Sequence, residues 1–182
     1  MDKRNFILEK LKSYKGIDSH EEAMRLEVIS FIEANEDCFE RSLKIGHVNG
    51  GAWIVDESFK YTLLTHHAKL DKWFQLGGHS DGNWNTLEVA LREGQEESGL
   101  ESIRPLNVRI FDIDIHTIPA RGEEAEHNHY EIRFIFVADK NESLIKSNES
   151  KDLSWIEVER VEELNSEEAM KRMVNKTKNL KI

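Results

Sequence analysis

Apolar residues divide the chain into a helical N-terminal part and a longer part of mixed character. Over residues 1–42 they recur at helical spacing, first at residues 7–14 and then, after Gly16, at residues 24–32. This part carries no obvious catalytic grouping, so we expect it to pack against the rest of the chain or to contact a partner. We therefore predict an N-terminal helical extension over residues 1–42 and a second domain over residues 43–182.

From Gly46 onward, short apolar stretches alternate with polar connections. Residues 52–55 and 61–64 form two such stretches, and the acidic connection between them predicts a β-hairpin. We predict further strands at residues 108–118, 130–138 and 153–156, and helices at residues 87–98 and 161–173. The lysine-rich tail is expected to fray. The predicted fold class is α+β, a mixed sheet with helices.

Composition and charge narrow the class of partner. The chain has 182 residues, of which 38% are hydrophobic and 33% are charged, which suits one domain with an extension. The formal net charge of −10 repels the phosphate backbone of long nucleic acids, so bulk nucleic acid is not expected as a partner. A small phosphorylated molecule still fits if divalent cations mask the local carboxylates.

Cysteine usage and hydropathy indicate a compartment. The single cysteine, Cys38, cannot form an intramolecular disulfide, which favours a reducing environment. No apolar run in the sequence approaches the roughly twenty residues that cross a bilayer, so no membrane contact is expected. We predict a cytoplasmic protein, and the sequence leaves a monomer and a homodimer open.

The stretch GGHSDGNWNTLEVALREGQEESGL, residues 77–100, carries the strongest chemical signal. Glu93, Glu96 and Glu97 stand at positions i, i+3 and i+4, so a helix places all three carboxylates on one face. Like charges in that arrangement repel each other, and a divalent cation removes the conflict. Hard oxygen ligands of this kind suit Mg²⁺ or Mn²⁺.

Other residues of the same stretch support this interpretation. Arg92 lies four residues before Glu96 and can hold it by a charge-assisted hydrogen bond. Gly99 can supply the left-handed residue that ends the helix, and Gly77 and Gly78 allow a tight loop before it. An isolated E-x-x-E-E on a helix is usually a solvated face, and the glycines and the arginine distinguish this string from that case.

The stretch resembles the Nudix box, G-x5-E-x7-R-E-U-x-E-E-x-G-U, in which U is a bulky apolar residue. The first glycine of the pattern corresponds to Gly78, and its later charged positions correspond to Arg92, Glu93, Glu96 and Glu97. The resemblance implies hydrolysis of a phosphoanhydride, with Glu93, Glu96 and Glu97 as metal ligands. It also implies catalytic roles for Arg92, Glu93 and Glu97.

Two positions depart from the family pattern. Trp84 stands where the pattern has its first glutamate, and Gly94, on the core side of the helix, stands where it has a bulky apolar residue.

The resemblance extends beyond the box to one branch of the family that has an N-terminal helical extension and no defined substrate. The strings that carry it are FERSLKIGHVNGGAWIV, LLTHHAKLDKWFQLGGHSDG, FDIDIHTIPAR and EHNHYEIRF. The resemblance implies a Nudix α/β/α sandwich with a mixed sheet.

Two of the predicted strands alternate strictly between apolar and ionisable residues. If they pair as a hairpin, their polar faces form one patch, made of Asp112, Asp114, His116, His127, His129, Glu131 and Arg133. This patch is either an ordinary exposed sheet face or the wall of a substrate cleft that opens towards the helix of the box. As a cleft it predicts the following substrate-binding residues: His79, beside the box loop, with His116, His129, Glu131 and Arg133.

Two further hypotheses involve residues outside the box. The three histidines within the fourteen residues 116–129 could hold a transition metal, although no cysteine accompanies them. Glu149 lies six residues before Trp155, and the resemblance implies that a loop glutamate at this spacing reaches the metal centre. We therefore include Glu149 as a catalytic candidate, a base or a ligand.

The expected reaction is metal-dependent hydrolysis of a phosphoanhydride in a nucleoside-diphosphate-linked small molecule. The water's proton goes to Glu97, Glu93 or Glu149, and the sequence does not choose among them. A Nudix fold that only binds a nucleotide-like metabolite, as a sensor, is the alternative that Trp84 and Gly94 favour. Isoprenoid diphosphate isomerase chemistry is disfavoured, because it relies on an active-site cysteine and Cys38 lies in the extension.

Overall fold

The N-terminal helices are α1 (Arg4–Ser13) and α2 (Ser19–Ala34) in the computed structural model, which describes residues 2–68, 70–148 and 150–180. Helix α2 ends at Ala34, so the prediction of helix as far as residue 42 is wrong. Cys38 and Phe39 are buried there, and the Cys38 carbonyl accepts a hydrogen bond from Val48 N–H at 2.7 Å. This contact with the first strand replaces further helical hydrogen bonds.

One eight-stranded mixed sheet is formed by the described residues, and β1 lies at its centre. Strand β1 pairs in parallel with β7 along its whole length, and on its other side it pairs antiparallel with β4 and then with β2. The strands are β1 (Gly46–Asp56), β2 (Tyr61–His67), β3 (Lys72–Phe74), β4 (Leu76–His79), β5 (Arg104–Pro105), β6 (Asp112–Ile118), β7 (His127–Ala138) and β8 (Ser150–Glu157).

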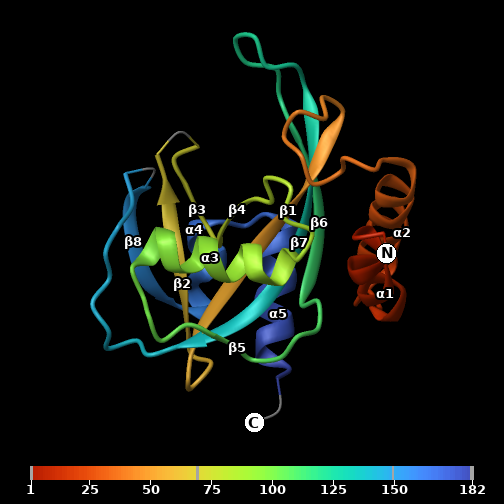
Figure 1. Cartoon of the computed structure of the whole chain (residues 1–182). Coiled ribbons are helices and arrows are strands. Elements are labelled where there is room, and N and C mark those ends of the chain that lie inside the picture. The colour runs from red at the N-terminus through yellow and green to blue at the C-terminus, as the bar shows by residue number, and fades with distance from the viewer. Residues whose placement is uncertain (1, 69, 149, 181–182) are drawn as a thin grey trace.

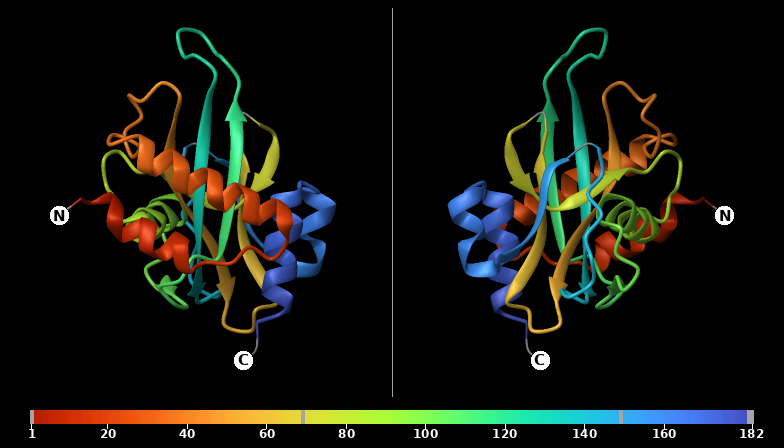
Figure 2. Two further views of the ribbon diagram at one scale, coloured as in Figure 1. Left: turned by 90° about the vertical axis from the view of Figure 1, so that its right-hand side faces the viewer. Right: turned by 90° about the vertical axis from the view of Figure 1, so that its left-hand side faces the viewer.

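Both predicted hairpins are confirmed. Strands β1 and β2 pair with Ile54 opposite Leu63. Strands β6 and β7 pair with His116 opposite His129, and their connection projects beyond the rest of the molecule (Figures 1 and 2). Strand β6 begins only at Asp112, four residues later than predicted. The expected α+β fold with a mixed sheet is therefore confirmed.

Helices cover both faces of the sheet (Figures 1 and 2). Helix α3 (Thr86–Ser98) shares one core cluster with α1 and α2, and the β1 residues Ala52 and Ile54 belong to it. The second cluster lies on the opposite face, where Trp53 of β1 meets α5 and donates a hydrogen bond to Thr177 Oγ1 at 2.8 Å. Since successive residues of a strand point to opposite faces, β1 serves both cores.

The C-terminal helical region is interrupted, so the prediction of one helix over residues 161–173 is wrong. The segments are η1 (Val158–Arg160), α4 (Val161–Leu164) and α5 (Glu168–Lys178). Asn165 separates the last two, because its side chain donates to the Trp73 carbonyl at 2.9 Å and accepts from Glu167 N–H at 3.0 Å. Helix α5 continues into the tail that was expected to fray. None of the helices in the described ranges is long and apolar enough to cross a membrane.

Candidate active site

Helix α3 is held against the sheet by its apolar side. Val89 and Ala90 are fully buried, and Gly94 also lies in the interface with β1. The helix ends at Gly99, whose φ of 70° is left-handed and whose N–H donates to the Gln95 carbonyl. The predicted helix, its core-facing Gly94 and its glycine cap are confirmed, and this packing directs part of its polar side towards β4.

Two of the three carboxylates of the box lie against the glycines of β4. Glu97 Oε2 accepts a hydrogen bond from Gly77 N–H at 3.0 Å. The Glu93 carboxylate lies so close to Gly78 that a Cβ there would be 2.5 Å from it. The Glu96 side chain is 60% exposed instead. Within the described ranges, no group of metal-ligating atoms within 4.8 Å of one another includes any of the three, so they do not converge in this structure.

Arg92 connects these carboxylates to β4. Its Nη2 lies 2.9 Å from Glu93 Oε1 and donates to the His79 carbonyl at 3.1 Å, and its Nη1 donates to Glu96 Oε2 at 3.3 Å. The predicted pairing of Arg92 with Glu96 is confirmed. Burial raises the pKa of Glu93, and the neighbouring Arg92 guanidinium opposes that shift.

The arrangement at β4 fits a hard divalent cation such as Mg²⁺ or Mn²⁺. Because Gly78 has no Cβ, the Glu93 carboxylate can lie directly against the backbone at this position. Glu93 and Glu97 carry carboxylate oxygens on neighbouring turns of one helix, and oxygen is the donor that these ions prefer. The glycine pair therefore allows a charged ligand set to approach the backbone of the sheet.

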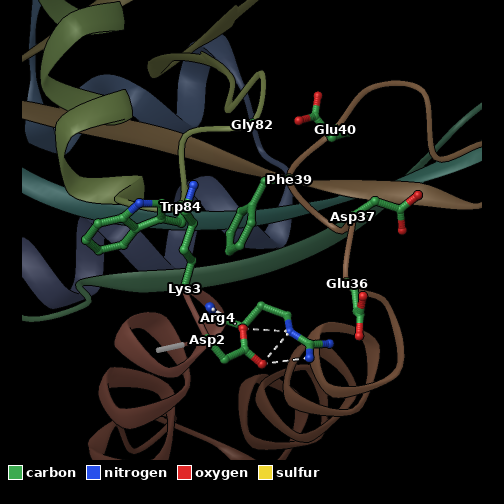
Figure 3. Close-up of a pocket in the computed structure, with 9 residues that line it drawn as sticks. All are labelled: Asp2, Lys3, Arg4, Glu36, Asp37, Phe39, Glu40, Gly82 and Trp84. Carbon is green, nitrogen blue, oxygen red and sulfur yellow. Dashed lines mark hydrogen bonds and ion pairs between the residues drawn. The ribbon is translucent and has the colours of Figure 1, made fainter.

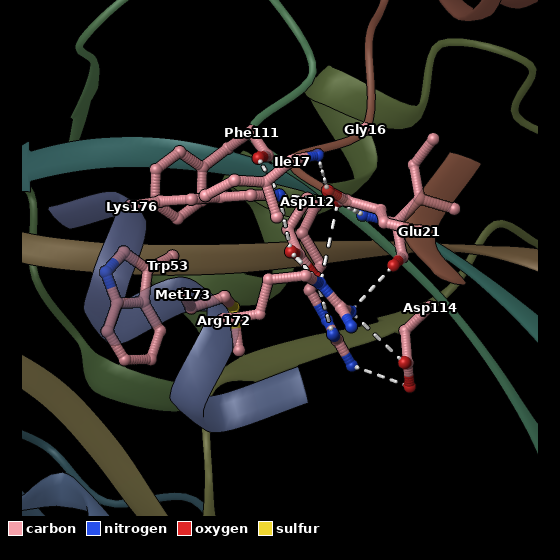
Figure 4. Close-up of polar contacts among 12 residues, drawn as sticks. Gly16, Ile17, Glu21, Trp53, Phe111, Asp112, Asp114, Arg172, Met173 and Lys176 are labelled. Atoms are coloured by element: carbon pink, nitrogen blue, oxygen red, sulfur yellow. Dashed lines mark hydrogen bonds and ion pairs between the residues drawn. The ribbon is translucent and has the colours of Figure 1, made fainter. Parts of the chain in front are cut away.

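A buried network of charges joins β6 to two helices (Figure 4). At its centre is Asp112, fully buried, which accepts hydrogen bonds from Arg133 at 3.0 Å, Arg172 at 2.7 Å and Lys176 at 2.7 Å. Burial would raise the pKa of Asp112, but these cations hold it below its usual value. The network contains three carboxylates and three cations: Glu21, Asp112, Asp114, Arg133, Arg172 and Lys176.

The polar side chains of β6 and β7 share one face of the sheet, as predicted, but it is the face opposite α3. A Cβ on Gly51 would meet Arg133 and Glu131, whereas a Cβ on the preceding Gly50 would meet α3 at Thr86. The expectation that this face opens directly towards the helix of the box is therefore wrong. The sheet itself separates two sets of residues, the carboxylates of the box on α3 and the polar side chains of β6 and β7. The alternation along the hairpin places all of the second set on the α5 side.

The two sets approach each other only at the edge strand β4. Gly78 lies against Glu93, and the next residue, His79, turns its ring to the polar face, where the ring centroid is 5.3 Å from that of His129. His116 lies beside them with a side chain 42% exposed. Glu131 is buried and accepts a hydrogen bond from the Asn49 amide at 3.0 Å.

Histidines concentrate at the end of this polar face. The rings of His47, His79, His127 and His129 lie with centroids 4.7–5.3 Å apart in five pairs. Burial lowers the pKa of His47 to about 4 and that of His129 to about 2, and neighbouring histidines add to both shifts. His47 was not among the predicted residues, because only the pairing of β1 with β7 brings it beside His129.

A model of the NUDIX domain family matches residues 47–177. The chain belongs to the Nudix hydrolase family. The enzyme class that the sequence predicted, a Nudix-type pyrophosphohydrolase, is confirmed at the level of the family, whose members generally cleave pyrophosphate bonds with divalent metal ions. No curated protein sequence matches the chain.

Solved Nudix structures share the fold of this chain. The E. coli dihydroneopterin triphosphate pyrophosphohydrolase superposes with a TM-score of 0.59 at 14% identity, covering 73% of this chain and 96% of its own. The C. elegans Ap4A hydrolase binary complex superposes with a TM-score of 0.54 at 17% sequence identity. The match covers 72% of this chain and 94% of the hydrolase chain. A NUDIX-family hydrolase from Clostridium perfringens superposes with a TM-score of 0.52 at 23% sequence identity. The match covers 74% of this chain and 98% of the clostridial chain. At these identities the similarity concerns the fold alone.

The first departure from the Nudix pattern, Trp84, has a structural explanation. Its indole packs edge-on against Phe6 of α1, with ring centroids 5.1 Å apart, so the position serves the contact with the N-terminal helices.

A hollow of about 610 Å³ opens beside Trp84 (Figure 3). It is lined by Asp2, Lys3, Arg4, Glu36, Asp37, Phe39, Glu40, Gly82 and Trp84. Its four carboxylates disfavour a phosphate, and the Glu93 and Glu97 cluster contributes nothing to its lining.

Glu149, the catalytic candidate beyond the Nudix box, lies outside the described residues. The strand that follows it, β8, begins at Ser150, whose side-chain oxygen lies 2.5 Å from Thr65 Oγ1 of β2. The role of Glu149 therefore stays a prediction from the resemblance.

Proposed function

We propose that this chain hydrolyses a phosphoanhydride bond in a nucleoside-diphosphate-linked small molecule with Mg²⁺ or Mn²⁺. One observation carries the proposal: two acidic side chains of the Nudix helix, Glu93 and Glu97, lie directly against the glycine pair of β4. Family membership supplies the reaction class, and this arrangement supplies a place where it can occur.

In this proposal Glu93 and Glu97 hold the metal, which supplies charge stabilisation for the phosphates when bound. Glu96 is the outer member of the set, and it can join only by leaving Arg92. Arg92 positions Glu93 and the backbone of β4 through its bonds to both. The proton of the attacking water passes to a carboxylate of the set formed by Glu93, Glu97 and Glu149.

The rest of the substrate is proposed to cross the edge of β4 and lie along the polar face. His79 is the residue at which the two sites meet, and His116 and His129 follow it on the same face. Glu131 and Arg133 form the base of this surface, where their own hydrogen bonds to Asn49, Asp112 and Asp114 fix them. Recognition there would use imidazole and carboxylate groups.

The division of the chain is also a proposal: an N-terminal helical extension over residues 1–42 and a Nudix domain over residues 43–182. The family match, which begins at residue 47, supports it. The extension is nevertheless tied to the domain through Glu21 and Phe6. For the compartment we propose the cytoplasm, in keeping with Cys38 as a buried free thiol.

The test is release of phosphate or of a nucleoside monophosphate from a panel of nucleoside triphosphates, sugar nucleotides, dinucleotides and coenzyme A. We expect turnover of at least one of these with Mg²⁺ or Mn²⁺ and loss of turnover after exhaustive chelation. Full activity after chelation would contradict the metal requirement. Tight binding of a panel member without any turnover would favour the sensor, which the replacement of one acidic box position by Trp84 supports.

A further inference from the structure

The polar face holds a group of three imidazoles, of which the proposed hydrolytic site uses only His129. The ligand atoms of His47, His127 and His129 all lie within 4.8 Å of one another. His47 lies directly opposite His129 in the parallel pairing of β1 and β7, and His127 is two residues earlier on the same face. Three strand positions of fixed register therefore direct three side chains to one point.

The burial of these side chains indicates a missing partner. His47 is 3% exposed and His127 is 7% exposed. Within the described residues, neither ring nitrogen of His47 has a hydrogen-bond partner, although buried polar atoms in proteins normally have one. A ligand that accepts a nitrogen lone pair would satisfy one of its two nitrogens.

A hydrogen bond to the backbone shows which ring nitrogen of His127 holds the lone pair. Its Nδ1 lies 2.9 Å from the Ala125 carbonyl, which can only accept, so Nδ1 carries the proton and Nε2 holds the lone pair that can coordinate. A backbone carbonyl behind the ring is also the usual support of a metal-bound histidine. His127 Nε2 and His129 Nε2 are 3.2 Å apart and form a hydrogen bond that a shared metal ion would replace. Two nitrogens bound tetrahedrally to one Zn²⁺ would be about 3.3 Å apart, from the usual Zn–N distance.

We propose that His47, His127 and His129 form a Zn²⁺ site distinct from the carboxylate site at β4. Three imidazoles suit Zn²⁺ and not Mg²⁺, and the exposed Glu124 carboxylate lies 3.9 Å from His127 Nε2. They leave a tetrahedral ion one position for water or for a ligand group, on the face where His79 and His116 lie. The site differs from the sequence-based hypothesis, because His47 of β1 replaces His116.

The experiment is a Zn²⁺ titration of the metal-free full-length protein against a chromophoric chelator, with excess Mg²⁺ to occupy the carboxylate site. We expect one Zn²⁺ per chain. His47→Gln and His129→Gln should each weaken binding about 100-fold or more. The matched control His20→Gln, an exposed histidine of α2, should bind like the parent, and so should Glu97→Gln.

A second measurement covers the case in which a histidine variant fails to fold. The anomalous signal from a crystal of the parent protein soaked in Zn²⁺ should peak among the three imidazoles. The proposal is overturned if the parent binds no Zn²⁺ beyond the carboxylate site. It is also overturned if the folded His47→Gln and His129→Gln variants keep full affinity, or if the anomalous peak lies elsewhere. Because Glu97→Gln binding is measured separately, failure here leaves the hydrolase proposal intact.

Discussion

Replacing Asp112 with asparagine tests whether the buried charge network holds the N-terminal helices and α5 to the sheet. The substitution preserves the shape of the side chain and removes one negative charge. The intact network balances three carboxylates against three cations. The variant leaves three cations against two carboxylates, Glu21 and Asp114, in a largely buried place.

The expected loss follows from the geometry of Asp112. Its two oxygens accept from Arg133, Arg172 and Lys176 at 2.7–3.0 Å, and the side chain is 0% exposed. Breaking a buried pair by removing one partner costs about 3–5 kcal/mol of unfolding free energy. In a chain of this size that corresponds to a fall in Tm of roughly 6–20 °C.

The assay is urea unfolding at neutral pH, followed by circular dichroism, with the exposed Asp37→Asn as control. Because the folded-state pKa of Asp112 is lowered, its contribution is present above the unfolded pKa of 3.8 and is lost as pH falls through the folded value. The difference between parent and Asp112→Asn should therefore shrink in acid. A variant within about 1 kcal/mol of the parent at neutral pH would refute the reasoning.

Further substitutions test the two departures from the Nudix pattern, Gly94 and Trp84. Gly94→Ala should leave stability unchanged or raise it by up to about 1 kcal/mol, since the added Cβ would lie 3.3 Å from the flexible end of Ile54. Gly94→Leu should lose about 1–3 kcal/mol by overpacking; thermal unfolding measures both, and a destabilised alanine variant would show that the close approach matters. A double-mutant cycle of Phe6→Leu and Trp84→Leu should give a coupling of about 0.5–1 kcal/mol, and strict additivity would show that the edge contact does not dock α1.

Elements with local signals were predictable from the sequence. The helix of the box has apolar residues on one side and ends at Gly99, and both signals lie within the segment itself. The alternation of β6 and β7 likewise predicted which side chains share a face. What the alternation could not give is the identity of that face, because the packing of α3 and α5 on opposite sides is not encoded within either strand.

Long-range partners explain the main errors. Lys176 lies in a lysine-rich tail that was expected to fray, yet it contacts Glu21, 155 residues away, and Asp112. His47 joins the histidine group only through the pairing of β1 with β7. Trp84 looked like a loss of catalytic acid, but its partner Phe6 belongs to a separate helix. In each case, the deciding contact comes from a distant segment that local periodicity does not specify.

The most direct test of the central claim is the turnover of Glu93→Gln and Glu97→Gln on the best substrate of the panel, with Mg²⁺ and at equal folded concentration. Glu88→Gln, an exposed acid of the same helix, is the matched control. The account predicts that the first two variants lose at least about 100-fold in kcat, while Glu88→Gln turns over like the parent. If Glu93→Gln and Glu97→Gln both kept parental turnover, the carboxylates at the β4 glycines would not be the metal site.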